Sequence, residues 1–216
     1  MNKLIQHLQE FNRKERFFLI CKTLGIDNFY LSNDFCKELN NVLPNLYFPI
    51  PANSFVAMDY HLDWIYASLY LTKNNPSDKL HRLNKEFITA TQEDVDLLIA
   101  FPDENNHLIT HMILCECKAE TGWTNKQVQS KANRFTKIFG DHAEKFSEIV
   151  IPYLVLISPV ESKRLSTKNI SQYLLVNNKL PWIELSIPNN LKKITRCDNT
   201  GKNSIEGEFW KVNKTH

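Results

Sequence analysis

The sequence predicts an α/β protein whose central sheet has mixed strand direction. Three runs rich in β-branched and apolar residues, over 86–91, 95–101 and 108–120, are joined by short turn-forming segments, as in consecutive antiparallel strands. A helix with an apolar stripe is predicted over 124–140, and a wholly apolar strand over 151–159. This helix makes a crossover that is compatible with parallel pairing of the strands on either side of it.

The residues before this region are expected to be mainly helical. Apolar residues recur at helical spacing over 4–11 and 17–24, and Gly25 stands where a helix C-cap is expected. Ser32 could cap a further short helix. After a proline-rich segment, the aromatic-rich run 54–73 predicts a longer helix that opens the core.

Composition indicates a single folded domain over 1–216. The 216 residues are 43% hydrophobic, which is enough to bury a substantial core. The five cysteines are odd in number and form no Cys-x-x-Cys pair, so neither a zinc knuckle nor a disulfide framework is predicted, and a cytoplasmic setting is expected. The N-terminal residues lack the apolar core of a signal peptide, and no apolar stretch is long enough to span a membrane.

The segments after 159 are expected to hold a short helix over 171–177 and a strand over 181–187.

Basic residues are concentrated in two places. Residues 126–145 carry five Lys or Arg against two acids, and residues 191–216 carry six against three. Such clusters could contact phosphates, but a charged stretch is more often a solvated face.

The strand over 108–120 ends in charged residues, Glu116 and Lys118, which need a physical reason. Because side chains alternate across a strand, these two share a face. Asp94 and Asp96 share a face of the preceding strand, so antiparallel pairing would bring an aspartate beside Glu116. Adjacent carboxylates repel each other unless a cation lies between them. Oxygen ligands without His or Cys favour Mg²⁺ or Mn²⁺ over zinc.

An aspartate at the head of one strand, Glu-x-Lys at the end of the next, and then a helix with a polar face resemble the PD-(D/E)XK nuclease superfamily. The resemblance covers about 54–158, preceded by a helical extension over 1–45. It implies a restriction-endonuclease-like αβββαβ core, with a mixed central sheet flanked by helices. The Pro-Asp dipeptide itself is absent, because Val95 precedes Asp96. Pro102-Asp103 lies in the turn and is not equivalent.

The resemblance assigns roles residue by residue. It implies that Asp96, Glu116 and the main-chain carbonyl of Cys117 bind Mg²⁺ or Mn²⁺, and that Lys118 assists catalysis. Many members of the superfamily have a glutamine near the start of the following helix, where this chain has Gln127. Asp94 remains the alternative to Asp96, which is favoured because the apolar run begins directly after it.

Two features of the 124–140 helix have competing interpretations. Gln127 completes the pattern of a capping box with Thr124, a role compatible with catalysis but independent of it. Lys131 and Arg134 follow Gln127 at helical spacing and could present positive charge to a phosphate backbone. The alternative for both is a solvated helix face.

Other candidate residues are given structural interpretations. Asp59, His61 and Asp63 alternate two apart, which would scatter them around a helix, although one of the two aspartates could be an additional acid of the site. Cys115 and Cys117 are expected to be core thiols. A second Glu-x-Lys, at 161–163, has no acid-headed strand before it. His107 and His111 are expected to be incidental.

The function implied by the resemblance is Mg²⁺-dependent hydrolysis of DNA phosphodiester bonds, and an endonuclease is the expected form. DNA is the expected partner, no membrane association is expected, and a homodimer is compatible with the sequence. Two alternatives stay open. The first is a non-catalytic module on the same fold that binds nucleic acid or a protein partner. The second is a metal-dependent hydrolase of another phosphoester.

Overall fold

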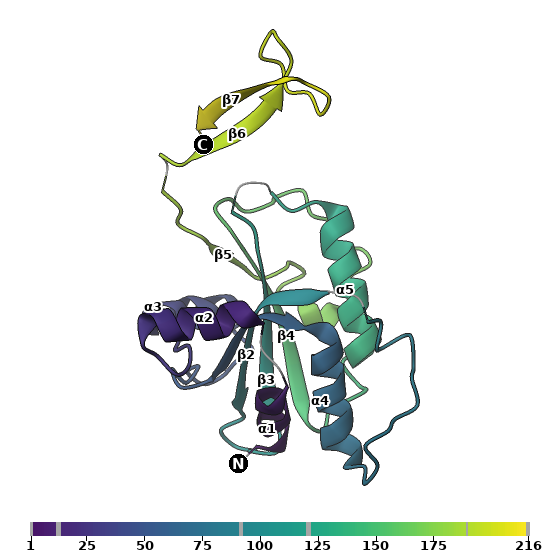
Figure 1. Cartoon of the computed structure of the whole chain (residues 1–216). Helices are drawn as coiled ribbons and strands as arrows, with labels where there is room; N and C mark the ends of the chain where they lie inside the picture. The colour runs from purple at the N-terminus through teal and green to yellow at the C-terminus, as the bar shows by residue number, and fades with distance from the viewer. Residues whose placement is uncertain (1, 12–13, 91–92, 120–121, 189, 215–216) are drawn as a thin grey trace.

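The computed structural model describes every residue except 1, 12–13, 91–92, 120–121, 189 and 215–216. Its centre is a five-stranded sheet in the order β1-β2-β3-β4-β5 (Figure 1). The strands are β1 (Phe55–His61), β2 (Asp94–Pro102), β3 (Thr110–Cys117), β4 (Val150–Ser158) and β5 (Trp182–Glu184). The pairs β1–β2 and β2–β3 are antiparallel, whereas β3–β4 and β4–β5 are parallel. The prediction of an α/β protein with a mixed sheet is confirmed.

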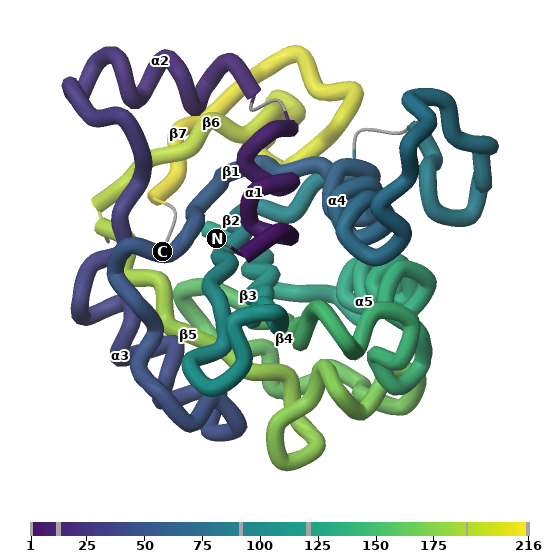
Figure 2. Tube along the Cα trace, turned by 90° about the horizontal axis from the view of Figure 1, so that it is seen from below, coloured from purple at the N-terminus to yellow at the C-terminus, as the bar shows by residue number. Residues whose placement is uncertain are grey.

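Helices cover both faces of the sheet. On one face lie α1 (Lys3–Glu10), α4 (Leu62–Asn74) and α5 (Asn125–Phe139), and on the other lies α3 (Asn33–Val42) (Figure 2). The helix α2 (Glu15–Leu24) precedes α3 in the chain. Because side chains alternate along the strands, the strands contribute residues to both cores. Leu98 and Leu114 belong to the α4–α5 core, whereas Ile99 and Ile113 belong to the α3 core.

The predicted helix ends are found in the structure. Gly25 caps α2 in the left-handed conformation, with φ of 67°. The Ser32 side chain accepts a hydrogen bond from the Phe35 N–H at 3.2 Å and so starts α3. The helix expected over 124–140 is α5, and its crossover joins the parallel pair β3 and β4 as predicted.

The prediction of one helix over 54–73 is wrong in its first third. Residues Phe55–His61 form the edge strand β1, and the helix α4 begins at Leu62. The run alternates as a strand does, with Phe55 and Ala57 in one core and Val56 in the other. Pairing with β2 supplies its backbone hydrogen bonds. The aromatic residues after 61 extended the apparent helical pattern backwards over this strand.

The strand predicted over 86–91 is absent from its described part, residues 86–90, which form turns and irregular chain. The place beside β2 is occupied by β1. The backbone of this segment is held by side chains instead, because Asp63 accepts from the N–H groups of Thr89 and Ala90 at 2.9–3.2 Å. The elements of the sheet and its crossover helices therefore follow along the chain as β1, α4, β2, β3, α5, β4 and β5.

The last part of the chain departs from the sheet. The helix expected over 171–177 is a single 3₁₀ turn (Gln172–Leu174), and β5 matches the expected strand. A separate antiparallel hairpin of β6 (Lys192–Cys197) and β7 (Phe209–Lys214) follows and stands away from the sheet in Figure 1. Within the described part of the chain, no helix has the length and apolarity needed to cross a membrane.

Candidate functional site

Asp96 and Glu116 lie at matching positions on two adjacent strands. The antiparallel pairing of β2 and β3 sets Leu97 opposite Cys115, and continuing this register by one residue sets Asp96 opposite Glu116. Glu116 shares its face with Leu114, which belongs to the α4–α5 core. Alternation does not assign Asp96 to one face, because Val95 and Leu98 both belong to that core. The charge of Asp96 also raises the pKa of Glu116, which indicates that the two groups are near each other. The two acids are thus near each other, and a cation shared between them stays a prediction.

Glu116 is a buried carboxyl. Its exposed fraction is 6%, and burial raises its pKa to about 7, with smaller contributions in the same direction from Asp96 and Glu93. Lys131 of α5 opposes this shift, because its ammonium lies 2.9 Å from Glu116 Oε1. This ion pair is the contact that the protein provides to Oε1, and the pKa of Glu116 stays raised in spite of it. The site therefore holds a carboxylate whose negative charge is incompletely stabilised by the protein.

Asp96 is anchored to the end of the neighbouring strand. The Cys117 N–H donates a hydrogen bond to Asp96 Oδ2 at 2.6 Å. This bond fixes the carboxylate beside the peptide that follows Glu116, next to the carbonyl expected as a third metal ligand. Cys117 itself is exposed, so the expectation that it is a core thiol is wrong, whereas Cys115 is buried as expected.

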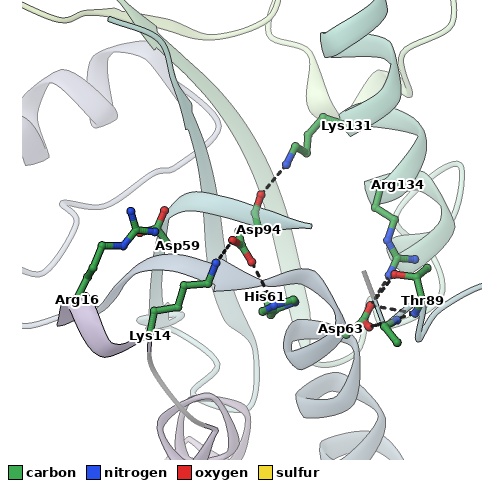
Figure 3. A network of polar contacts seen from close by, with 10 residues as sticks. Lys14, Arg16, Asp59, His61, Asp63, Thr89, Asp94, Lys131 and Arg134 are labelled. Atoms are coloured by element: carbon green, nitrogen blue, oxygen red, sulfur yellow. Dashed lines mark hydrogen bonds and ion pairs between the residues drawn. The ribbon is translucent and has the colours of Figure 1, made fainter. Parts of the chain in front are cut away.

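Asp94 is engaged in a different set of contacts (Figure 3). Its side chain pairs with Lys14 and lies 3.5 Å from the His61 ring nitrogen. Its main-chain carbonyl accepts a hydrogen bond from the Lys131 ammonium at 2.5 Å. Asp94 is thus held by cationic groups of the protein, and Asp96 is the aspartate opposite Glu116.

Lys118 follows Glu116 on the same face. Its ammonium lies 5.3 Å from the centre of the Trp123 ring, in a cation–π contact. Its N–H donates to the carbonyl of Ile157 at 2.8 Å, which holds the end of β3 against β4. The side chain is half-buried and lies at the boundary between the carboxylates and the loop that precedes α5.

Gln127 forms the capping box that its spacing suggested. The Thr124 hydroxyl accepts from the Gln127 N–H at 3.4 Å, and Gln127 Oε1 accepts from the Thr124 N–H at 3.3 Å. This pair satisfies backbone groups at the start of α5. The structural interpretation of Gln127 is confirmed, and no contact with Asp96 or Glu116 supports a catalytic one.

Arg134 has a structural environment and does not face a solvated groove. It is 5% exposed, and its guanidinium donates to Asp63 Oδ1 at 2.8 Å and to the carbonyls of Glu86 and Phe87 at 2.8 and 2.6 Å (Figure 3 shows the contact with Asp63). Arg134 therefore stabilises residues 86–90, and these contacts do not support its predicted role as a phosphate contact. Lys131 likewise points to Glu116 and Asp94 rather than away from the protein.

The acids of β1 and α4 do not assemble a metal centre. Asp59 pairs with Arg16 at 2.8 Å, and Asp63 is bound to Arg134. Across the described residues, no cluster of three or more His, Cys, Asp or Glu side chains is suited to hold a metal ion. A divalent ion at this site would depend on Asp96, Glu116 and main-chain oxygen.

The sequence did not reveal a buried hydrogen-bonded chain around His111. The His111 ring lies 2.8 Å from Asp103 Oδ2 and 2.9 Å from the Tyr153 hydroxyl. The contact with His111 lowers the pKa of Asp103, and burial raises the pKa of Tyr153 above its usual range. The chain lies in the α3 core, at the opposite end of β3 from Glu116, so it is separate from the carboxylate pair. In the sequence, the Pro102-Asp103 dipeptide was the only feature that pointed to this group of residues.

Comparison of the chain with protein-family models, with curated proteins and with solved structures finds no match.

Proposed function

We propose that the protein is a metal-dependent nuclease that hydrolyses DNA phosphodiester bonds. The observation that carries this proposal is the placement of Asp96 beside the end of β3 that holds Glu116, with Lys118 directly after that strand. The resemblance to PD-(D/E)XK nucleases concerns the order and chemistry of these residues. The strand order of the sheet is compatible with it but does not establish it, because β1 and α4 replace the expected helix and first strand.

The residues fit a divalent cation in one specific respect. The pKa of the buried Glu116 carboxyl is raised to about 7 although the Lys131 ammonium lies 2.9 Å from its Oε1, so additional positive charge beside it would be stabilising. Asp96, Glu116 and the carbonyl of Cys117 would hold Mg²⁺ or Mn²⁺, which prefer such oxygen ligands. When bound, the ion would polarise the phosphate and lower the pKa of a water molecule.

Two lysines have distinct roles in this proposal. Lys131 supplies positive charge to Glu116 in the structure and limits the cost of the buried carboxylate. Lys118 is not paired with that carboxylate but lies beside Trp123. Its ammonium is therefore the group suited to contact the substrate phosphate and to stabilise the charge that develops there.

The test is Mg²⁺- or Mn²⁺-dependent cleavage of supercoiled and linear DNA. We expect Lys118→Ala to slow cleavage by about 100-fold or more while the protein remains folded. Glu116→Gln should abolish both cleavage and metal affinity. Lys37→Ala, an exposed substitution in α3 on the opposite face, is the control and should cleave normally. Wild-type cleavage rates in Lys118→Ala would refute the assigned role.

A second candidate is a non-catalytic module that binds nucleic acid or a protein partner. The observation that favours it is the position of Lys131, which already places a cation at Glu116 and could make the pair purely structural. Binding of DNA without cleavage in the presence of either metal would support this alternative. Cleavage of another phosphoester, but of neither DNA nor RNA, would support a hydrolase of a different substrate class.

A further inference from the structure

A cavity of about 420 Å³ lies at the ends of β4 and β5. Its volume is within the range of small-ligand sites, about 300–1,000 Å³. Two tryptophans line it, together with an apolar residue of β4 and polar or basic residues of the following loops. The lining includes Trp123, Leu156, Lys163, Asn178, Lys179 and Trp182.

The strand register ties this cavity to the candidate site. Glu116 is opposite Leu156, and Leu156 is opposite Trp182, so the three residues form one row across the sheet. Leu156 and Trp182 both contribute to the α4–α5 core, the face to which Glu116 belongs. Since neighbouring strands are about 4.8 Å apart, the backbone of Trp182 is about 10 Å from that of Glu116. A strand of B-form geometry covers this distance in about three nucleotides.

The walls of the cavity suit a flat aromatic ring. The Trp182 indole is oriented by a hydrogen bond from its Nε1 to the Ser158 hydroxyl at 2.9 Å. Trp123 is fixed at its backbone, where its N–H donates to Ser162 Oγ at 2.8 Å, and its own Nε1 is buried without a partner. The Lys118 ammonium lies over the Trp123 ring, on the side of the catalytic candidates.

The rim of the cavity suits an anion. Lys163 and Lys179 are exposed at its edge, and Asn178 adds an amide that can both donate and accept. Glu161 is the acid among the lining residues. An aromatic ring attached to phosphates has the shape and charge that such a site selects. Nucleobases meet this description, since they stack on aromatic side chains regardless of their identity.

We propose that the Trp123–Trp182 cavity holds one unpaired base of the nucleic-acid strand whose nearby phosphate is presented to Asp96 and Glu116. This inference rests on the proposed nuclease function and narrows its substrate class. The enzyme acts on DNA that has an unpaired or extrudable base within about three nucleotides of the cut. Lys163 and Lys179 then contact the phosphates on either side of that base.

The test measures binding without metal, in EDTA, so that it does not depend on cleavage. Fluorescently labelled duplexes with one unpaired base are compared with fully paired duplexes of the same length. Wild-type protein should bind the first more tightly, and Trp182→Leu should lose about 10-fold affinity for it while binding paired DNA normally. Trp210→Leu is the matched control, because Trp210 is 66% exposed on the separate hairpin.

A second substitution covers the case in which Trp182→Leu does not fold. Lys179→Ala, at an exposed position, should also weaken binding of the unpaired-base duplex, by roughly 2- to 5-fold at moderate salt. Equal affinity of the wild type for both duplexes would overturn the proposal. So would loss of the preference in Trp210→Leu with retention in Trp182→Leu, which would move the aromatic contact to the hairpin.

Three further outcomes distinguish this inference from binding of free nucleotides and from the proposed function. A mononucleotide that binds as tightly as the oligonucleotide would show that the cavity serves free nucleotides, and would overturn the strand-binding form. Cleavage by the wild type without any preference for an unpaired base would refute the cavity's role and leave the nuclease proposal intact. Preference without cleavage in Mg²⁺ or Mn²⁺ would support the cavity and refute the nuclease.

Discussion

Replacing Glu116 by glutamine should change how stability depends on pH. Burial raises the pKa of Glu116 from an ordinary value of 4.5 to about 7, so the folded protein holds this proton more tightly than the unfolded chain does. The contribution of protonated Glu116 to the free energy of unfolding is therefore fully present below the pKa of the unfolded chain. It is lost as the pH rises through the pKa of the folded protein. Glutamine has a similar shape and never ionises, so Glu116→Gln should escape this loss.

The magnitude follows from the width of that pH window. A shift of about 2.5 pH units corresponds to about 3 kcal/mol at 1.36 kcal/mol per unit. Most of it develops between about pH 5 and about pH 8.5, where the free energy of unfolding of the wild type should fall by about 2–3 kcal/mol relative to the variant. Because Glu116 is only 6% exposed, solvent screening reduces this value little.

The assay is urea unfolding of both proteins at the two pH values, in EDTA. Glu148→Gln is the control, since Glu148 is half-exposed and its pKa is lowered by Lys73, which predicts a small change of the opposite sign. The reasoning is refuted if wild type and Glu116→Gln change in parallel with pH. That result would show that Lys131 keeps Glu116 ionised in the folded protein across the whole range.

Two further predictions concern stability away from the carboxylates. Arg134→Met should lower the free energy of unfolding by about 3–5 kcal/mol, because it leaves Asp63 and the carbonyls of residues 86–87 without their buried donor; a loss below about 1 kcal/mol in urea unfolding would contradict this role. Tyr153→Phe should cost about 1–3 kcal/mol, since it removes the partner of a buried His111 ring nitrogen, and an unchanged unfolding midpoint would contradict the importance of that contact.

Sequence patterns predicted the parts of the fold that are controlled locally. Ser32, Gly25 and the Thr124–Gln127 pair mark helix ends through their own backbone contacts, and all are found where expected. The strands around the turn at 102–107 were also predicted, because apolar runs flank a short polar segment. The proximity of Asp96 and Glu116 follows from that turn and from the pairing of β2 with β3.

The failures concern features decided by tertiary contacts. Residues 55–61 and 86–90 are both short and mixed in character, and pairing with β2 selects the first as the strand. Arg134 occupies a helix position that sequence alone could not distinguish from a solvated one. Its burial depends on Asp63, which lies 71 residues earlier in the chain. The same long-range dependence hid the contact between His111 and Tyr153.

The central claim is that Asp96 and Glu116 share a divalent cation, and Mn²⁺ binding followed by electron paramagnetic resonance tests it most directly. The wild type should bind Mn²⁺ at neutral pH, and Mg²⁺ should compete. Asp96→Asn and Glu116→Gln should each weaken binding by at least about 10-fold, because each removes a carboxylate ligand. Lys118→Ala should bind normally. Affinity that is undetectable in the wild type, or unchanged in both carboxylate variants, would contradict the claim.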